Sequence, residues 1–529
     1  MRELNSTSLL RNLALTAVAL VAFAATGEEH QRGPVVTTSD GRVRGISSGG
    51  VDQFLGIPYA AAPLGDLRWR PPQPNAGWQG VRDASKFASH CPQLGTPYGL
   101  PSTTEDCLYL NVFTPGKTNN GQPHLLPVMF WIHGGALIVG ESDGYDPMPL
   151  VANDVIVVTI NYRLGWLGFL AHPALTAESP QDASGNYGLM DQQAAMRWVQ
   201  RNIRHFGGDP SNVTIFGESA GGLSTHSQLV SPLAAGLFEK AIVESGAYSL
   251  TQPTLAAAEA SGTKFATAAG CASQTAACLR ALSVSTILAA PTPSSIVPNL
   301  DGYVMPTSVG PALAAGQFNR VPVIEGSNHD EWRLFVAQTE KATGTPLTAA
   351  GYIPAIQATL GVSAGVAAFI ASKYPLANYS SPSVALGAIG TDAVFACNAR
   401  VAAHALSNYV PTFQYQFSDE NAPMLYFAPP ISFPTGAYHA SELTYIFDLV
   451  GTPVPPPPFT PPQQQLSAAM AAYWTQFARS GDPNATGAPV WPQYMAASDQ
   501  FESLQPALPV TGTGFSADHQ CAFWTPANP

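Results

Sequence analysis

Charged side chains are scarce in this sequence, and no part of it is strongly basic. Charged residues make up 11% of the 529 residues, the formal net charge is −12, and lysines and arginines do not cluster anywhere. A protein that binds nucleic acid needs a basic surface that neutralises phosphates. The composition therefore argues against a nucleic-acid partner. Hydrophobic residues make up 46% of the chain, which is enough for a large core and excludes a disordered protein.

The sequence also lacks the signs of a metal centre and of internal repeats. None of its cysteine and histidine pairs has the spacing of a metal site, so we expect neither a metal nor a cofactor. An even number of cysteines in an exported protein suggests disulfides, although six cysteines allow about fifteen pairings. The spacing suggests two short loops and one link to the C-terminal tail: Cys91–Cys107, Cys271–Cys278 and Cys397–Cys521.

The N-terminus has the pattern of a secretory signal peptide. Two arginines precede an apolar run at residues 13–25, and Ala22-Phe23-Ala24 fits a small-x-small cleavage site. The run is short for a bilayer span, and no other segment appears long and apolar enough, so we expect no stable membrane anchor. The prediction is a signal peptide at 1–24, one domain at 25–529, and a secreted or periplasmic protein.

Short apolar segments recur along the chain in the manner of buried strands. Their lack of polar alternation is typical of a mainly parallel sheet that is covered on both faces. The segments lie at residues 127–135, 154–163, 212–222, 240–246, 320–328 and 412–417.

Helical segments separate these strands. Residues 188–207 have apolar side chains at helical spacing, and the alanine-rich stretches 251–300 and 335–410 are predicted as helical insertions. Residues 453–465 are proline-rich and are predicted as a stiff loop, with a helix starting at Leu466. The alternation predicts an α/β fold, with a mainly parallel central sheet flanked by helices and with large helical insertions.

One motif, GESAGG at residues 217–222, combines a serine with flanking glycines. An apolar strand leads into it and a plausible helix follows. A reactive serine needs this strand–turn–helix frame, because the glycines permit a sharp turn and the helix N-terminus faces the developing oxyanion. We therefore predict that Ser219 is a nucleophile; the alternative is a small residue in a packed turn. The expected oxyanion donors are the backbone N–H groups of Gly134, Gly135 and Ala220.

A serine nucleophile also needs a base and an acid that orients the base. His439 is favoured as the base, because it follows a glycine-containing loop and precedes an apolar stretch. Asp330 and Glu331 both follow a predicted strand, and spacing alone leaves the choice between them open. The other candidates that follow the serine are His226, His329, His404 and His519 for the base, and Asp301 and Asp392 for the acid.

Longer motifs resemble the type-B carboxylesterase/cholinesterase family of α/β-hydrolases from about residue 35 to 525. They are FLGIPYAAAPLGDLRWRPPQP, EDCLYLNVFTP, NYRLGWLGFL and the block from GNYGLMDQQAAMRWVQRNIRHFGGDP to GESAGG. The resemblance implies an α/β-hydrolase fold with insertions that line a gorge, and a serine carboxylesterase of small-molecule esters that needs no cofactor or metal. It leaves open a lipase, an amidase, an esterase of toxins or polyester fragments, a non-catalytic adhesion protein, and a monomeric or dimeric state.

The family motifs also assign roles to individual residues. Ser219 resembles the nucleophile, Glu331 in GSNHDEW the acid, and His439 in HASE the base. Glu218 resembles an acidic neighbour that tunes the electrostatics or positions water, and Ser245 a residue beside the base. The family's disulfides agree with the three pairs given above.

Three departures from the family pattern concern the shape of the pocket. Leu137 in HGGAL replaces a more common phenylalanine, and Trp332 stands where the acid motif usually has glycine. The segment between Cys91 and Cys107 has no tryptophan, whereas this loop of cholinesterases supplies a ring that binds quaternary ammonium. Choline esters are therefore not expected to be preferred substrates.

Overall fold

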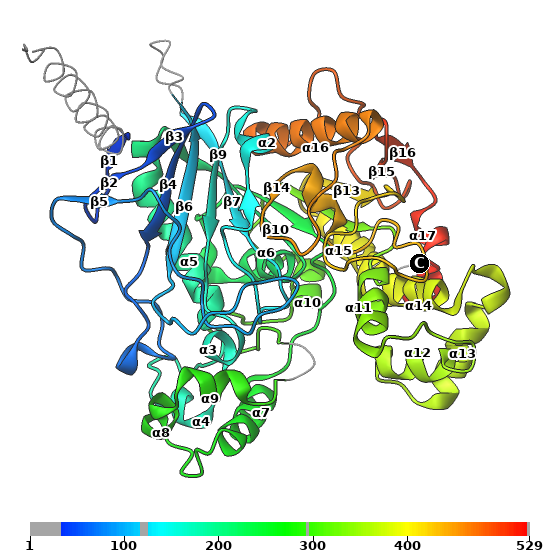
Figure 1. Cartoon of the computed structure of the whole chain (residues 1–529), viewed down its shortest axis with the longest axis horizontal. Helices are drawn as coiled ribbons and strands as arrows, with labels where there is room; N and C mark the ends of the chain where they lie inside the picture. The colour runs from blue at the N-terminus through cyan, green and yellow to red at the C-terminus, as the bar shows by residue number, and fades with distance from the viewer. Residues whose placement is uncertain (1–32, 117–124, 293–295, 526–529) are drawn as a thin grey trace, which may run out of the picture.

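A central sheet of 11 strands organises the protein (Figure 1). The computed structural model describes residues 33–116, 125–292 and 296–525, so the predicted signal peptide lies outside the described residues. The strands are ordered β16-β15-β13-β12-β11-β10-β7-β9-β6-β4-β3. Their bounds are β3 Ile46–Ser48, β4 Val51–Pro58, β6 Tyr109–Pro115, β7 Leu126–Ile132, β9 Ile156–Ile160, β10 Gly208–Glu218, β11 Lys240–Glu244, β12 Val323–Asn328, β13 Thr412–Phe417, β15 Phe501–Leu504 and β16 Val510–Gly512.

Neighbouring strands from β9 to β15 run parallel, and antiparallel pairs occur towards both edges of the sheet. This arrangement confirms the predicted α/β fold with a mainly parallel sheet. Successive residues of one strand enter opposite cores: Phe130 of β7 packs in one hydrophobic cluster, and Met129 and Trp131 pack in the other. Because both faces are buried, the strand sequences are almost continuously apolar.

Helices cover both faces of the sheet, and the helices on each face pack in a different hydrophobic cluster. Trp198 of α5 packs in one hydrophobic cluster, and Trp474 of α16 packs in the other. The helices are α2 Met148–Val151, α3 Gly165–Phe169, α4 Pro173–Thr176, α5 Tyr187–Asn202, α6 Ala220–Val230, α7 Leu255–Ala268, α8 Ala276–Ala281, α9 Val284–Ala289, α10 Val309–Ala315, α11 Arg333–Thr343, α12 Tyr352–Leu360, α13 Ala364–Lys373, α14 Pro382–Gly390, α15 Cys397–Ser407, α16 Pro461–Ser480, α17 Phe515–Asp518 and α18 Cys521–Trp524.

The alanine-rich stretches form helices, as predicted, but the start of α16 differs from the prediction. The helix begins at Pro461 and not at Leu466, so the last residues of the expected proline-rich loop are helical. Proline is compatible with the first turn of a helix, because the N–H group that it lacks would have no intrahelical partner. Thr460 and Gln463 form a capping box that fixes this start.

Two small sheets lie outside the central sheet in the described part of the chain. Strands β1 (Val35–Thr37), β2 (Arg42–Arg44) and β5 (Val81–Asp83) form a separate three-stranded sheet. Strands β8 (Tyr145–Asp146) and β14 (Asp448–Leu449) form a two-stranded one.

From the sequence, we expect no further segment that is long and apolar enough to span a membrane, and this expectation is wrong. One helical segment of the described chain meets both criteria. The continuous helical run Pro382–Ser407, with a π-helical turn at Thr391–Ala396, has a mean hydropathy of 1.2. It is nevertheless 72% buried inside the protein over its most apolar window. This segment is therefore apolar because it packs in the protein core.

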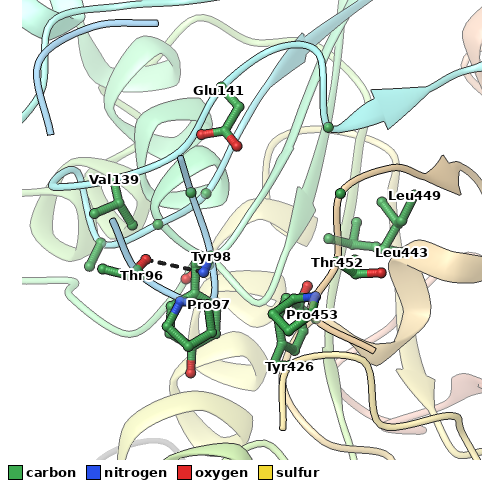
Figure 2. Close-up of a pocket in the computed structure, with 18 of the residues that line it drawn as sticks. Thr96, Pro97, Tyr98, Val139, Glu141, Tyr426, Leu443, Leu449, Thr452 and Pro453 are labelled. Carbon is green, nitrogen blue, oxygen red and sulfur yellow. Dashed lines mark hydrogen bonds between the residues drawn. The ribbon is translucent and has the colours of Figure 1, made fainter. Parts of the chain in front are cut away.

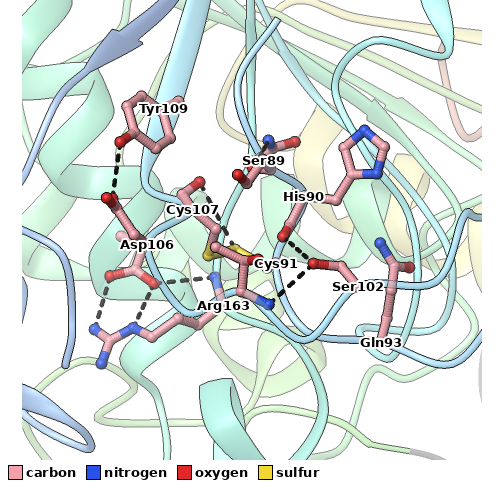
Figure 3. Close-up of a disulfide and its surroundings, with 12 residues drawn as sticks. Ser89, His90, Cys91, Gln93, Ser102, Asp106, Cys107, Tyr109 and Arg163 are labelled. Atoms are coloured by element: carbon pink, nitrogen blue, oxygen red, sulfur yellow. Dashed lines mark hydrogen bonds and ion pairs between the residues drawn. A yellow bond between two sulfur atoms is a disulfide. The ribbon is translucent and has the colours of Figure 1, made fainter. Parts of the chain in front are cut away.

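Three disulfides are present, and they join the pairs that the sequence suggested: Cys91–Cys107, Cys271–Cys278 and Cys397–Cys521. Figure 3 shows the first, with hydrogen bonds that tighten its loop: Ser102 Oγ donates to the carbonyl of His90, and the backbones of Gln93 and Ser102 pair with each other. The third disulfide ties α15 to the C-terminal segment across a sequence separation of 124 residues.

Two of the disulfides close loops of very different length, and we expect their removal to have unequal effects on stability. A crosslink that closes a longer loop removes more entropy from the unfolded chain. We expect the double variant Cys397→Ser, Cys521→Ser to lose about 4–5 kcal/mol of unfolding free energy, and Cys271→Ser, Cys278→Ser, with a separation of 7, about 2–3 kcal/mol. Denaturant titration measures both values, and equal losses would contradict the loop-length argument.

Candidate active site

Ser219 lies on a strained turn between strand β10 and helix α6. Its backbone has φ 55° and ψ −116°, a conformation that L-residues rarely adopt. The turn is held at both ends, because the Ser219 N–H donates to the carbonyl of Glu244 at 2.9 Å and its carbonyl accepts from Leu223 at 2.8 Å. The side chain is therefore held at the carboxyl edge of the parallel sheet, where α/β proteins build their sites.

The glycines of GESAGG are required by close packing. A Cβ atom on Gly221 would lie 1.9 Å from the carbonyl oxygen of Ile132, and one on Gly217 would lie 2.5 Å from the carbonyl carbon of Gly221. Helix α6 thus begins in backbone contact with the end of β7. This contact explains why the motif combines a serine with small neighbours.

The Glu331 carboxylate and the His439 imidazole form a buried pair. His439 Nδ1 lies 2.6 Å from Glu331 Oε2. The other oxygen, Oε1, accepts hydrogen bonds from the backbone of Asn328 at 2.7 Å and from Ser245 Oγ at 2.5 Å. The carboxylate is therefore fixed from three sides, and it holds the ring so that Nε2 faces away from Glu331.

Asp330, the other open candidate for the acid, points elsewhere. Its carboxylate pairs with His329 at 3.0 Å and with Arg333 at 2.9 Å, and it accepts a hydrogen bond from the backbone of Ala437. Burial alone would raise the pKa of Asp330, but its hydrogen bond with His329 and the charges of His329 and Arg333 lower it. Asp330 therefore belongs to a structural ion-pair cluster.

The other candidate histidines have separate surroundings. His226 pairs with Glu325 at 2.8 Å in the core, and His519 pairs with Asp392 at 2.7 Å. Neither of these histidines, nor His404, belongs to the described lining of the cavity that contains Ser219 and His439.

Glu218 lies beside the imidazole. His439 Nε2 is 3.1 Å from Glu218 Oε1. Among the described residues, no hydrogen bond joins the Ser219 hydroxyl to His439, although both side chains line the same cavity. Burial raises the pKa of Glu218 well above its usual range, and the charges of Glu331 and Glu244 raise it further. Burial therefore favours the neutral form of Glu218, which weakens its electrostatic attraction for the imidazole.

The backbone turn after strand β7 contains Gly134 and Gly135, two of the three residues that were expected to supply oxyanion donors. Gly135 and Ala136 have φ values of 96° and 57° and line the cavity. The Gly134 backbone instead forms a hydrogen bond with the Tyr145 hydroxyl, which lowers a Tyr145 pKa that burial raises. Ala136 is therefore a further candidate donor that the sequence analysis did not include. Its positive φ, unusual for alanine, is visible only in the folded chain.

Ser219 belongs to the lining of a cavity of about 640 Å³. Figure 2 shows other residues that line this cavity. Tyr98 and Tyr426 pack with ring centroids 5.0 Å apart at one side, and Glu141 projects from the turn after β7. The described lining of the cavity comes from residues within 95–100, 134–145, 334–338 and 439–453, together with Glu218, Ser219 and Tyr426. The described lining includes Leu334, Phe335 and Gln338 of helix α11 and no residue of 251–300. Helices α7, α8 and α9 instead pack below the sheet (Figure 1).

Fold and site together define a hydrolase of the α/β-hydrolase class. Comparison with known proteins narrows this class. The family model described as "Carboxylesterase family" matches residues 32–524. The chain is 34% identical to the cocaine esterase of Homo sapiens, over 98% of this chain and 96% of that protein. It is 37% identical to the para-nitrobenzyl esterase of Bacillus subtilis, over 87% of this chain and 92% of that protein.

A solved structure titled PNB esterase aligns with a TM-score of 0.74 at 34% identity, and covers 92% of this chain and 98% of its own. The chain belongs to the carboxylesterase family. It is a carboxylic-ester hydrolase that acts on small-molecule esters.

The ion-pair cluster of His329 predicts a pH-dependent stability. Burial alone would lower the pKa of His329, but its hydrogen bonds with Asp330 and Asp518 raise it to about 10. A raised pKa gives stability that is complete below the unfolded value of about 6.5 and is lost as the pH rises through the folded value.

We therefore expect wild type to be more stable than His329→Gln below about pH 6.5, with a difference that shrinks towards pH 10. Urea unfolding of both proteins between pH 6 and 10 measures this difference. A difference that stays constant over the range would show that His329 stabilises the protein without its charge.

Proposed function

We propose that this enzyme hydrolyses esters through an acyl-enzyme on Ser219, with His439 as the base and Glu331 as the acid that orients it. The observation that carries the proposal is the 2.6 Å contact between Glu331 and His439, because the His439 side chain lines the same cavity as Ser219 on its strained turn. A serine hydroxyl becomes nucleophilic only with a positioned base, and the base must be held in the correct tautomer.

The first half of the reaction forms the acyl-enzyme. His439 Nε2 turns from Glu218 to the Ser219 hydroxyl and removes its proton as the oxygen attacks the ester carbonyl. Such hydrogen bonds are often long without substrate and tighten when it binds. Glu331 fixes the protonated ring through Nδ1 and stabilises its charge. The alkoxide of the substrate then leaves with the proton from His439.

The oxyanion of each tetrahedral intermediate is stabilised by backbone N–H groups. Gly135, Ala136 and Ala220 are proposed as donors, and the N–H of Gly134 contributes less because it also bonds the Tyr145 hydroxyl. Each donor of this kind is worth about 2.7–4 kcal/mol of barrier. In the second half, His439 activates a water molecule that releases the acid and regenerates the serine.

We also propose that residues 1–24 are a cleaved signal peptide and that residues 25–529 function as one domain outside the cytoplasm. The three disulfides are compatible with an extracellular or periplasmic location, since such bonds persist in oxidising compartments. Sequencing the N-terminus of the exported protein would test the cleavage site.

The variant Ser219→Ala tests the nucleophile. We expect kcat for p-nitrophenyl acetate to fall by about 10⁶-fold, to the background rate, while the fold survives. A series of p-nitrophenyl esters from acetate to palmitate, measured on wild type and variant in parallel, gives the rates. Esterase activity retained by a pure variant would refute the role of Ser219.

The variants Glu331→Gln and Asp330→Asn test which of the two acids orients His439. Each replaces a carboxyl group by an amide, at adjacent positions. We expect Glu331→Gln to lower kcat by about 10⁴-fold with little change in KM, because the imidazole loses its orienting charge. Asp330→Asn should lower thermal stability and leave kcat nearly unchanged. The reverse result would assign the orienting role to Asp330.

A further inference from the structure

Three aromatic side chains form a wall behind and beside the His439 imidazole. We call Trp332, Phe335 and Phe395 the aromatic wall. The centroids of Trp332 and Phe335 lie 4.7 Å apart, and Phe335 and Phe395 stack nearly parallel at 6.2 Å and 10°. Phe335 and Phe395 also pack against the imidazole, at 5.3 Å and 4.9 Å. The wall therefore borders the place where the substrate reacts.

The three rings have different access to the substrate. Of the three, which all belong to the described part of the chain, Phe335 lines the cavity and the other two do not. Phe395 is 4% exposed and lies behind the imidazole. Trp332 lies against Phe335 at 4.7 Å and against Phe395 at 6.2 Å, and of these two neighbouring rings Phe335 is the one that lines the described cavity.

Gly390 holds the indole of Trp332 in place. A Cβ atom on Gly390 would lie 2.0 Å from Trp332 Cγ, so the ring lies directly on the backbone at the end of α14. The backbone N–H of Trp332 also donates to Thr391 Oγ1 at 3.0 Å. The indole therefore lies between the backbone at the end of α14 and the ring of Phe335.

We propose that Trp332 determines substrate specificity by acting as a wedge between Gly390 and Phe335. The wedge keeps Phe335 in the cavity and limits the bulk of the substrate group that lies beside His439. Unbranched groups fit against the ring, whereas quaternary-branched groups collide with it. This inference rests on the proposed ester hydrolysis at Ser219, because it concerns the substrates of that same site.

The variant Trp332→Gly removes the wedge and tests the proposal. Two pairs of esters vary the bulk on each side of the ester bond: p-nitrophenyl acetate against p-nitrophenyl trimethylacetate, and ethyl acetate against tert-butyl acetate. The readout is the ratio of kcat/KM for the bulky and the small ester. We expect this ratio to rise about tenfold or more in one of the two pairs, which identifies the side that contacts Phe335.

Trp78→Gly is a matched control. The indole of Trp78 also lies on a glycine, since a Cβ on Gly41 would be 2.5 Å from Trp78 Nε1, but Trp78 does not belong to the described lining of the cavity. We expect both ratios to stay at their wild-type values in this variant. Titration of the reactive serine with an organophosphate corrects every rate for the fraction of folded enzyme.

Ratios that remain unchanged in both ester pairs for Trp332→Gly, or that change equally in Trp78→Gly, would overturn the proposal. If Trp332→Gly does not fold, Phe335→Leu decides the question, because it widens the same part of the cavity directly and must raise the same ratio. A wild-type protein that hydrolyses none of the four esters would instead contradict the proposed function, so the two failures are distinguishable.

Discussion

Backbone contact between helix α6 and the ends of two strands is the constraint on which the site depends. Gly221 lies against the carbonyl of Ile132 at the end of β7, and Gly222 lies against the backbone of Gly246, just after β11. Side chains at these positions would push the helix away from the sheet edge. The contact is close enough that residue 219 must take a left-handed conformation to connect strand and helix. Ser219 is thus placed by packing at its neighbours.

Buried carboxyl groups around this contact define the electrostatics of the site. Burial raises the pKa of Glu218 and Glu442 well above the usual range, and that of Glu244 to about 8. Glu331, in contrast, accepts hydrogen bonds from the backbone of Asn328 and from Ser245 Oγ, and it contacts His439 Nδ1. The carboxyl group at the imidazole is therefore held in place by hydrogen bonds, whereas burial biases its acidic neighbours towards neutrality.

Much of the fold could be predicted from sequence, because strands buried on both faces leave a strong apolar signal. The six predicted segments correspond to β7, β9, β10, β11, β12 and β13. The start of α16 differs from the prediction because a proline-rich composition indicates a stiff loop, although the first turn of a helix also accepts proline. The helical run Pro382–Ser407 was not identified from the sequence as long and apolar enough to span a membrane. Its glycines and its single aspartate interrupt the run of apolar residues. Ala136 was missed because a positive φ at alanine has no sequence signature.

The sequence by itself determined the serine, its strand–turn–helix frame and the family motifs, because these depend on local spacing and on glycines that nothing else can replace. Which of the two adjacent carboxyl groups, Asp330 or Glu331, contacts His439 depends on tertiary structure, since adjacent side chains leave the chain in different directions. The same holds for Trp332. The departure of Trp332 from the family motif is visible in the sequence. Its contact with Gly390, however, joins segments more than fifty residues apart. Only tertiary packing therefore determines that Trp332 lies against Phe335.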